Sequence, residues 1–160
     1  GGGEGPFSPT RMGSMAVTDL LTYFGPGDIE RLRSLCSQTG GFGSYFGTSN
    51  SDTVHKMVEE GDPKAVRVWN AMIYQIIKWI GAMSTVLKGE VDSILLTGGL
   101  LRFPDVAEQI RESCEWIAPV SVYVGELEQE AMAEGALRVL RGEEEAKKYP
   151  GRPVWTGFQN

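Results

Sequence analysis

The sequence is poor in the residues that build metal clusters, disulfide frameworks and basic surfaces. Only two cysteines and one histidine occur among its 160 residues, which argues against a zinc site and against a disulfide framework. Cys36 and Cys114 fall on apolar faces of expected helices, so we expect two reduced core thiols. The net charge of −6 and the lack of a long basic run argue against a surface that binds nucleic acid.

Long apolar segments are lacking as well. No uncharged stretch reaches the roughly eighteen apolar residues that a membrane span needs, and no basic segment followed by an apolar one opens the sequence. Insertion into a membrane and secretion therefore have no support. These absences lead us to expect an acidic cytoplasmic protein.

The composition that is present is typical of a globular protein. Hydrophobic residues make up 41% and charged residues 22%, and the length suits a single domain over residues 1–160. Glycine and proline make 1–15 irregular, and 149–160 is expected to be a C-terminal tail that packs back on the domain through 153–155. Apolar spacing predicts helices over 17–24, 28–36, 53–60, 62–88, 103–114 and 127–141, with a glycine-rich turn region at 40–51.

The longest of these helices has the clearest start. Asp62 is a good N-cap and Pro63 suits the first helical position. Apolar residues occur on nearly every face of 62–88, so we expect this helix to be covered almost all round and to be the most buried element. In the helix that starts at Asp28, Ile29 is expected to face inward, whereas His55 is expected to be a surface helix residue.

Two short apolar runs, 91–97 and 120–124, each end at glycine and flank the helix 103–114. Such a strand, helix and strand form a βαβ unit with parallel neighbouring strands, so both glycine turns should open at one edge of the sheet. Gly98 and Gly99 would let a phosphate or sugar approach the backbone, with the carboxylate of Glu128 beside them. This pattern predicts a nucleotide and metal site; ordinary tight-turn chemistry is the alternative.

Several motifs, in order along the chain, resemble butyrate kinases, which belong to the acetate kinase family of the actin-like ATPase superfamily. They include Glu-Gly-Pro-Phe-Ser-Pro followed by Arg11, Thr-Gly-Gly after a strand, and Gly-Glu-x-Glu before the last helix. The resemblance spans nearly the whole chain and lies in segments 4–11, 45–48, 71–75, 80–89, 96–99, 117–120, 125–128 and 134–140.

The resemblance implies a helix-rich α/β fold, a partial ribonuclease-H-like (actin-like ATPase) domain with a small parallel sheet. It implies reversible transfer of the γ-phosphate of ATP to a short-chain carboxylate, giving acyl phosphate and ADP, with Mg²⁺. Only the family's C-terminal portion is matched; its N-terminal domain and the strand hairpin that opens its C-terminal domain are expected to be missing. Two origins stay open for residues 1–3: a remnant of the hairpin's phosphate loop, or a linker.

The resemblance also assigns two residues to the reacting phosphoryl group. Arg11 matches the family arginine that approaches this group, and its planar guanidinium suits phosphoryl oxygens. Its alternative role is a surface arginine paired with Glu4. Glu128 matches the acidic residue that helps to hold Mg²⁺, an ion that needs few protein carboxylates. Its alternative role is a helix-start glutamate favoured by the macrodipole.

The remaining assignments concern the nucleoside. Asn50 matches a nucleoside-contacting position, and two residues later the family commonly has arginine where this chain has Asp52, which puts nucleotide affinity in doubt. The adenosine motif of the family is matched by Thr97, Gly98, Gly99 and Leu100.

Three functions are consistent with these observations. The first is the C-terminal part of a butyrate kinase-like enzyme, with the isolated chain inactive because half a cleft cannot orient donor and acceptor. The second is a truncated nucleotide-binding module without turnover. The third is a structural module that pairs with another chain, either an N-terminal half or a homodimer partner.

Overall fold

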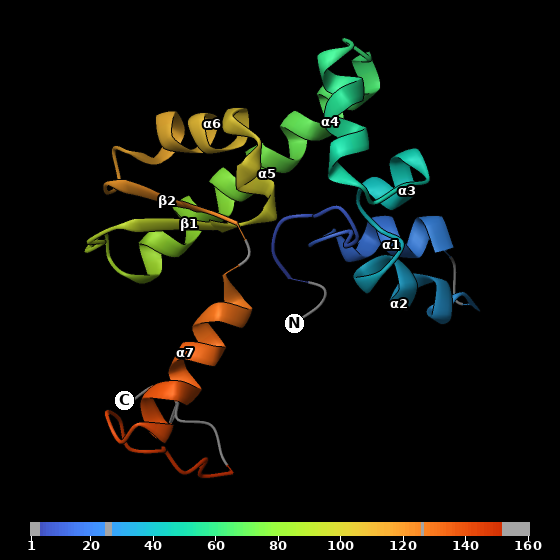
Figure 1. Cartoon of the computed structure of the whole chain (residues 1–160). Helices are drawn as coiled ribbons and strands as arrows, with labels where there is room; N and C mark the ends of the chain where they lie inside the picture. The colour runs from blue at the N-terminus through green and yellow to red at the C-terminus, as the bar shows by residue number, and fades with distance from the viewer. Residues whose placement is uncertain (1–3, 25–26, 126, 152–160) are drawn as a thin grey trace. The chain divides into compact units, whose positions relative to one another are not determined.

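The computed structural model describes residues 4–24, 27–125 and 127–151, and divides into two compact units, Gly1–Gly125 and Glu126–Asn160. The single-domain organisation stays a prediction. Figure 1 labels the elements, which are α1 (Val17–Phe24), α2 (Ile29–Ser37), α3 (Phe42–Phe46), α4 (Ser51–Glu59), α5 (Pro63–Val86), β1 (Ile94–Gly98), the 3₁₀ helix η2 (Gly99–Arg102), α6 (Pro104–Cys114), β2 (Val120–Val124) and α7 (Glu128–Leu140).

The sheet of the first unit consists of β1 and β2, which pair in parallel across the crossover helix α6. Ile94 is opposite Val120 and Gly98 is opposite Val124, which confirms the predicted βαβ unit. The first strand begins three residues later than predicted. Val91 belongs instead to a turn, in which its N–H donates to the carbonyl of Gly89 at 3.0 Å. One face of β1 is buried, whereas Leu95 on the other face is 65% exposed.

The crossover helix α6 packs one apolar face into the core. Its buried residues are spaced three or four apart, as the sequence pattern predicted, and are Val106, Ala107, Ile110 and Cys114. This spacing places all of them on one side of the helix, against α5 and the sheet.

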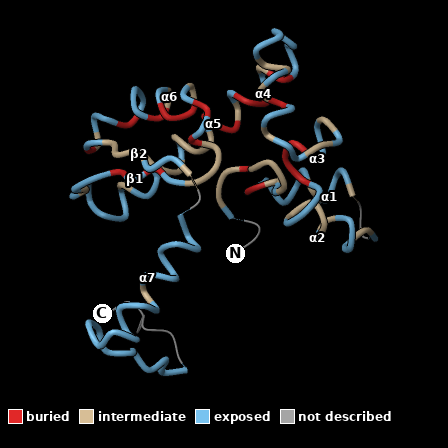
Figure 2. The backbone as a smooth tube through the Cα atoms, viewed as in Figure 1, coloured by how far each residue is buried: buried red, intermediate tan, exposed pale blue. Residues whose placement is uncertain are grey.

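The long helix α5 is buried in only one of its halves. Asp62 caps it by accepting a hydrogen bond from the N–H of Ala65 at 2.7 Å, and Pro63 occupies its first turn. Trp69 is fully buried and stacks on Phe42, with ring centroids 5.6 Å apart. Cover decreases along the later half, where Ile76 and Ile80 pack on the core but are only half-buried and Met83 is 50% exposed. Figure 2 shows this gradient. The prediction of cover on nearly all sides is therefore wrong for this half.

Other predictions about α-helices need smaller corrections. The glycine-rich region 40–51 contains the short helix α3, which the sequence pattern did not indicate. Ile29 on α2 is 62% exposed rather than inward-facing. The predicted packing of 153–155 and the origin of residues 1–3 lie outside the described residues. Within the described parts of the chain, no helix is long and apolar enough to cross a membrane.

Candidate nucleotide site

Two glycine turns meet at the carboxyl edge of the sheet. Gly98 is the last residue of β1, Gly125 follows β2, and the two form an isolated backbone bridge. Their φ angles of 108° and 110° lie in a region that side chains disfavour. A Cβ added to either glycine would meet nothing within 4 Å. The predicted arrangement of both turns at one edge is present, and the space beside them is open.

The predicted adenosine segment continues from this edge into η2. Thr97 is exposed, Gly98, Gly99 and Leu100 are half-buried, and the chain then turns inward. A groove of about 390 Å³ lies next to this segment, between η2, α6 and β2. Its walls are mostly apolar, with charged side chains at Arg102, Glu108 and Arg111, and its apolar residues are Leu101, Pro104, Ala107, Val122 and Val124. A mostly apolar groove with a few charged groups is typical of a small-molecule site.

The N-terminus of α4 carries the other predicted nucleoside contact. Asn50 caps this helix, and its side-chain oxygen accepts a hydrogen bond from the N–H of Thr53 at 3.0 Å. Asp52, in the first turn of α4, pairs with Arg102 of η2 through two hydrogen bonds. The structure therefore brings the start of α4 to the adenosine segment. The negative charge that put nucleotide affinity in doubt has a cationic partner.

His55 is not the surface residue that the sequence suggested. Only 17% of its side chain is exposed, and its ring stacks on Phe103 with centroids 4.4 Å apart. Its Nε2 lies 3.2 Å from Oδ1 of Asp105, and Trp69 donates from its indole N–H to Oδ2 of the same carboxylate at 2.8 Å. Asp105 therefore links α4, α5 and α6.

Arg11 lies in an irregular segment that is held closely to the rest of the first unit. The N–H of Arg11 donates to Oγ of Ser8 at 3.1 Å, and the N–H of Ser8 donates to the carbonyl of Arg11 at 3.0 Å. On either side, the N–H of Met12 donates to Leu35 and that of Gly40 to Thr10, both to carbonyls at 3.0 Å.

This anchoring leaves the Arg11 side chain accessible. The residue is exposed, and its guanidinium forms no ion pair with Glu4 or with any other residue in the described ranges. The alternative pairing with Glu4 is therefore not formed. A fixed backbone with a free guanidinium suits a group that must meet an anion.

Glu128 is the first residue of α7, in the second unit, and it is exposed. Its predicted place beside Gly98 and Gly99 stays a prediction. Among the described residues, no three His, Cys, Asp or Glu side chains gather as a metal site would require. A single accessible carboxylate fits Mg²⁺, which keeps several waters and takes its other ligands from phosphates.

The two cysteines are free, as expected, and they do not belong to the candidate site. Cys114 is buried in the α6 face, and burial raises the pKa of its thiol because the thiolate would lose its solvation. Cys36 is half-buried on α2. A neutral thiol in the core is a poor nucleophile, so Cys114 serves packing.

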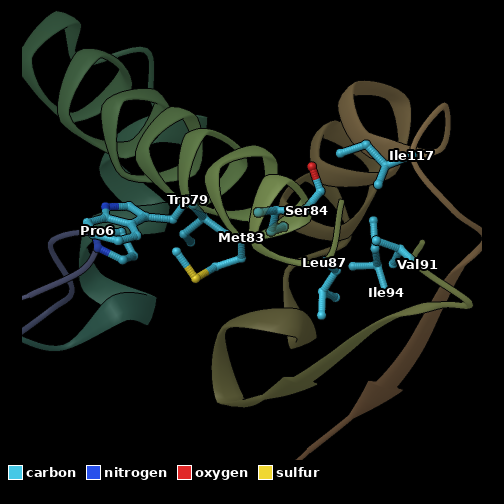
Figure 3. Close-up of a pocket in the computed structure, with 10 residues that line it drawn as sticks. Pro6, Trp79, Met83, Ser84, Leu87, Val91, Ile94 and Ile117 are labelled. Carbon is cyan, nitrogen blue, oxygen red and sulfur yellow. The ribbon is translucent and has the colours of Figure 1, made fainter. Parts of the chain in front are cut away.

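A second groove, of about 320 Å³, lies along the later half of α5 and holds none of the predicted site residues (Figure 3). Trp79 and Met83 line it from the helix, and Val91 and Ile94 line it from the segment entering β1. Its one hydroxyl, that of Ser84, donates to the carbonyl of Gly81 at 2.8 Å. A groove so poor in polar groups does not suit a nucleotide.

Comparison with known proteins supports the fold. No protein-family model matches the chain. An acetate kinase from Porphyromonas gingivalis superposes on 86% of it with a TM-score of 0.71 and 19% identity. A propionate kinase from Francisella tularensis subsp. tularensis SCHU S4 superposes on 77% with a TM-score of 0.64 and 12% identity. The chain spans 41% and 38% of those proteins. It therefore has the helix-rich α/β fold of one part of these kinases, as predicted.

Proposed function

We propose that this chain is the nucleotide-binding, C-terminal part of a short-chain carboxylate kinase of the acetate kinase family. The reaction would be reversible transfer of the γ-phosphate of ATP to butyrate or a related acid, giving acyl phosphate and ADP. The observation that carries the proposal is the pair of glycine turns at Gly98 and Gly125, open on one side, in a fold shared with two such kinases. In open α/β sheets, ligands bind at this edge.

Arg11 has the chemistry for the transferring group. Phosphoryl transfer depends on positioning and on stabilising charge that spreads over the equatorial oxygens, which a free guanidinium can contact in a planar fork. Arg11 is exposed on an anchored segment, so it can meet that group without first breaking an ion pair. We assign Arg11 the role of stabilising the charge of the phosphoryl group in the transition state.

Glu128 would hold Mg²⁺ through one carboxylate oxygen, directly or through water. Bound Mg²⁺ would neutralise charge on the nucleotide phosphates. Thr97, Gly98, Gly99 and Leu100 would hold the nucleoside and its phosphates through backbone that lacks obstructing side chains.

The second candidate is a non-catalytic nucleotide-binding or structural module that needs a partner half, either an N-terminal half chain or a second copy. The sequence left this candidate open, and the chain spans 41% and 38% of the two solved kinases. If the opposite wall of a cleft lies in another polypeptide or segment, the 160-residue chain cannot orient the carboxylate. Losing orientation costs about 7–11 kcal/mol of barrier lowering.

Hydroxamate trapping of acyl phosphate, with butyrate and Mg-ATP, separates these candidates. We expect no turnover from the isolated chain and recovered turnover once an N-terminal half with the opening hairpin is added. In the reconstituted enzyme, Arg11→Ala should lower kcat more than it raises KM for ATP, because its contact strengthens in the transition state. Glu128→Ala should raise the Mg²⁺ requirement.

One control variant and two possible outcomes complete the test. Arg33→Ala, on the exposed surface of α2, removes an arginine outside the proposed site and should leave kcat unchanged. Turnover by the isolated chain would contradict the proposal that part of the active site lies outside these 160 residues. A reconstituted pair that binds ADP without turnover would favour the non-catalytic module.

A further inference from the structure

The turn that follows Gly98 is fastened to another helix at its far end. Arg102, the last residue of η2, donates from Nε to Oδ1 of Asp52 at 3.2 Å and from Nη2 to Oδ2 at 2.8 Å. In such a bidentate pair, a guanidinium and a carboxylate fix each other's orientation as well as their separation. Asp52 lies in the first turn of α4, so the pair ties η2 to the start of that helix.

The next residue provides a second anchor to the same helix. Phe103 is 8% exposed and stacks on His55, which lies one turn after Asp52 on α4. The guanidinium carbon of Arg102 lies 4.8 Å from the centroid of the Phe103 ring, so the ion pair and the ring stack are in contact. Two consecutive residues of the chain are thus held by two side chains of α4.

The near end of the turn is held by backbone pairing alone, since Gly98 lies opposite Val124 of β2 and forms a bridge with Gly125. Nothing lies within 4 Å of the position that a Cβ of Gly98 would take. Glycine gives such a turn more accessible conformations than another residue would, and a ligand that binds the turn must order it. Anchors at Arg102 and Phe103 reduce that ordering cost, because they fix where the turn ends.

We propose that Asp52 and Arg102 form a clamp that positions the 98–102 turn for nucleotide binding. This inference rests on the proposed function, because it concerns the same site. Arg102 is here a positioning residue: its guanidinium is occupied by Asp52, and the nucleotide is held by the turn. The pair is half-exposed, with 46% of the Arg102 side chain and 66% of the Asp52 side chain accessible, so its effect should be modest.

Calorimetric titration of the 160-residue chain with ADP in the presence of Mg²⁺ tests the clamp. Arg102→Gln and Asp52→Asn should each weaken ADP binding about two- to five-fold, the range expected for an exposed ion pair. The double variant should be no weaker than either single variant, because both remove the same interaction. Arg31→Gln is the matched control, since it breaks the exposed pair with Asp28 on α2 and should leave ADP affinity unchanged.

The charge-swapped variant, Asp52→Arg with Arg102→Asp, distinguishes positioning from direct contact. A clamp works in either polarity, so the swap should restore ADP affinity. If the swap binds ADP more weakly than Arg102→Gln, while Asp52→Asn has no effect, Arg102 contacts the nucleotide itself and the positioning role is overturned. Unchanged affinity in Arg102→Gln also overturns it.

Hydrogen exchange of the 98–103 amides without nucleotide separates the clamp from the proposed function. Arg102→Gln should speed exchange in this segment, and the swap should reverse the change. If the unaltered chain binds no ADP, both the proposed function and the role of the clamp in nucleotide binding are contradicted. Faster exchange would still establish the clamp as a feature of the fold. Unchanged exchange in Arg102→Gln would remove the clamp whether or not ADP binds.

Discussion

Two buried or half-buried glycines in the first unit have positive φ angles for different reasons. Gly41, with φ of 55°, has the carbonyl oxygen of Ser8 only 1.6 Å from the position of a Cβ. Gly98, with φ of 108°, has nothing within 4 Å of that position. The first glycine is required by the packing of one backbone against another, and the second by its own backbone conformation at a strand end.

The difference between the two glycines shows where the protein leaves space for a ligand. At Gly41, the protein fills the space itself, and the close approach holds the segment that carries Arg11. At Gly98, the same residue type borders open space at the edge where ligands of α/β sheets bind. A glycine motif in a sequence indicates a binding site only when the glycine borders open space, as Gly98 does.

Substitution at the packed glycine should have the largest effect. Gly41→Ala forces a side chain into a left-handed conformation and into the Ser8 carbonyl, which should cost roughly 2–5 kcal/mol of unfolding free energy. Urea denaturation, monitored by circular dichroism, measures this loss of unfolding free energy. A loss below that of Gly98→Ala would contradict the distinction between the two glycines.

Gly98→Ala should cost less stability and more affinity. Its φ of 108° and ψ of 170° lie in a region that is essentially restricted to glycine, so the strain should cost about 1–3 kcal/mol without any clash. The strained turn would also move the backbone that we propose holds ADP. Calorimetry should show weaker ADP binding in a protein that remains folded. Unchanged affinity would separate Gly98 from the nucleotide site.

Gly81→Ala provides the matched control and should have the smallest effect. This glycine lies inside α5, without a positive φ and with no atom within 4 Å of a Cβ. Alanine should therefore raise the unfolding free energy by about 0.5–1 kcal/mol through its better helix propensity. The same urea series measures it. Destabilisation by Gly81→Ala would show that open space around a glycine does not predict whether alanine is tolerated there.

Local patterns predicted much of the fold because their causes are local. The Asp62 and Pro63 start of α5 depends on a few consecutive residues, and the apolar face of α6 depends on a spacing within eleven residues. The parallel pairing of β1 and β2 followed from the length of the connection between them. The position of Gly98 at the end of β1 was predicted in the same way.

Features that depend on distant residues could not be predicted. Apolar periodicity in α5 shows which residues could be covered, but not that cover stops before Met83. The pairing of Asp52 with Arg102 joins residues 50 apart in sequence, and no local pattern specifies it. Arg102 does offer one signal, since it is the first charged residue after Gly99. The enclosure of His55 by aromatic rings likewise depends on Phe103 and Trp69 from other elements.

The helix α7 has thirteen residues and none of them is buried. A helix of this length that is not covered within its own unit is only marginally stable in water, so its backbone should open more often than a packed core. We therefore expect a protease to cleave α7 in the folded protein, without global unfolding first. Its exposed apolar residues, Met132 at 67% and Leu140 at 82%, suit the specificity pockets of enzymes that cleave beside large hydrophobic side chains. The rate at which a cellular protease removes Glu128 would then depend on how often this helix opens. The glycine turns at the edge of the sheet would stay intact.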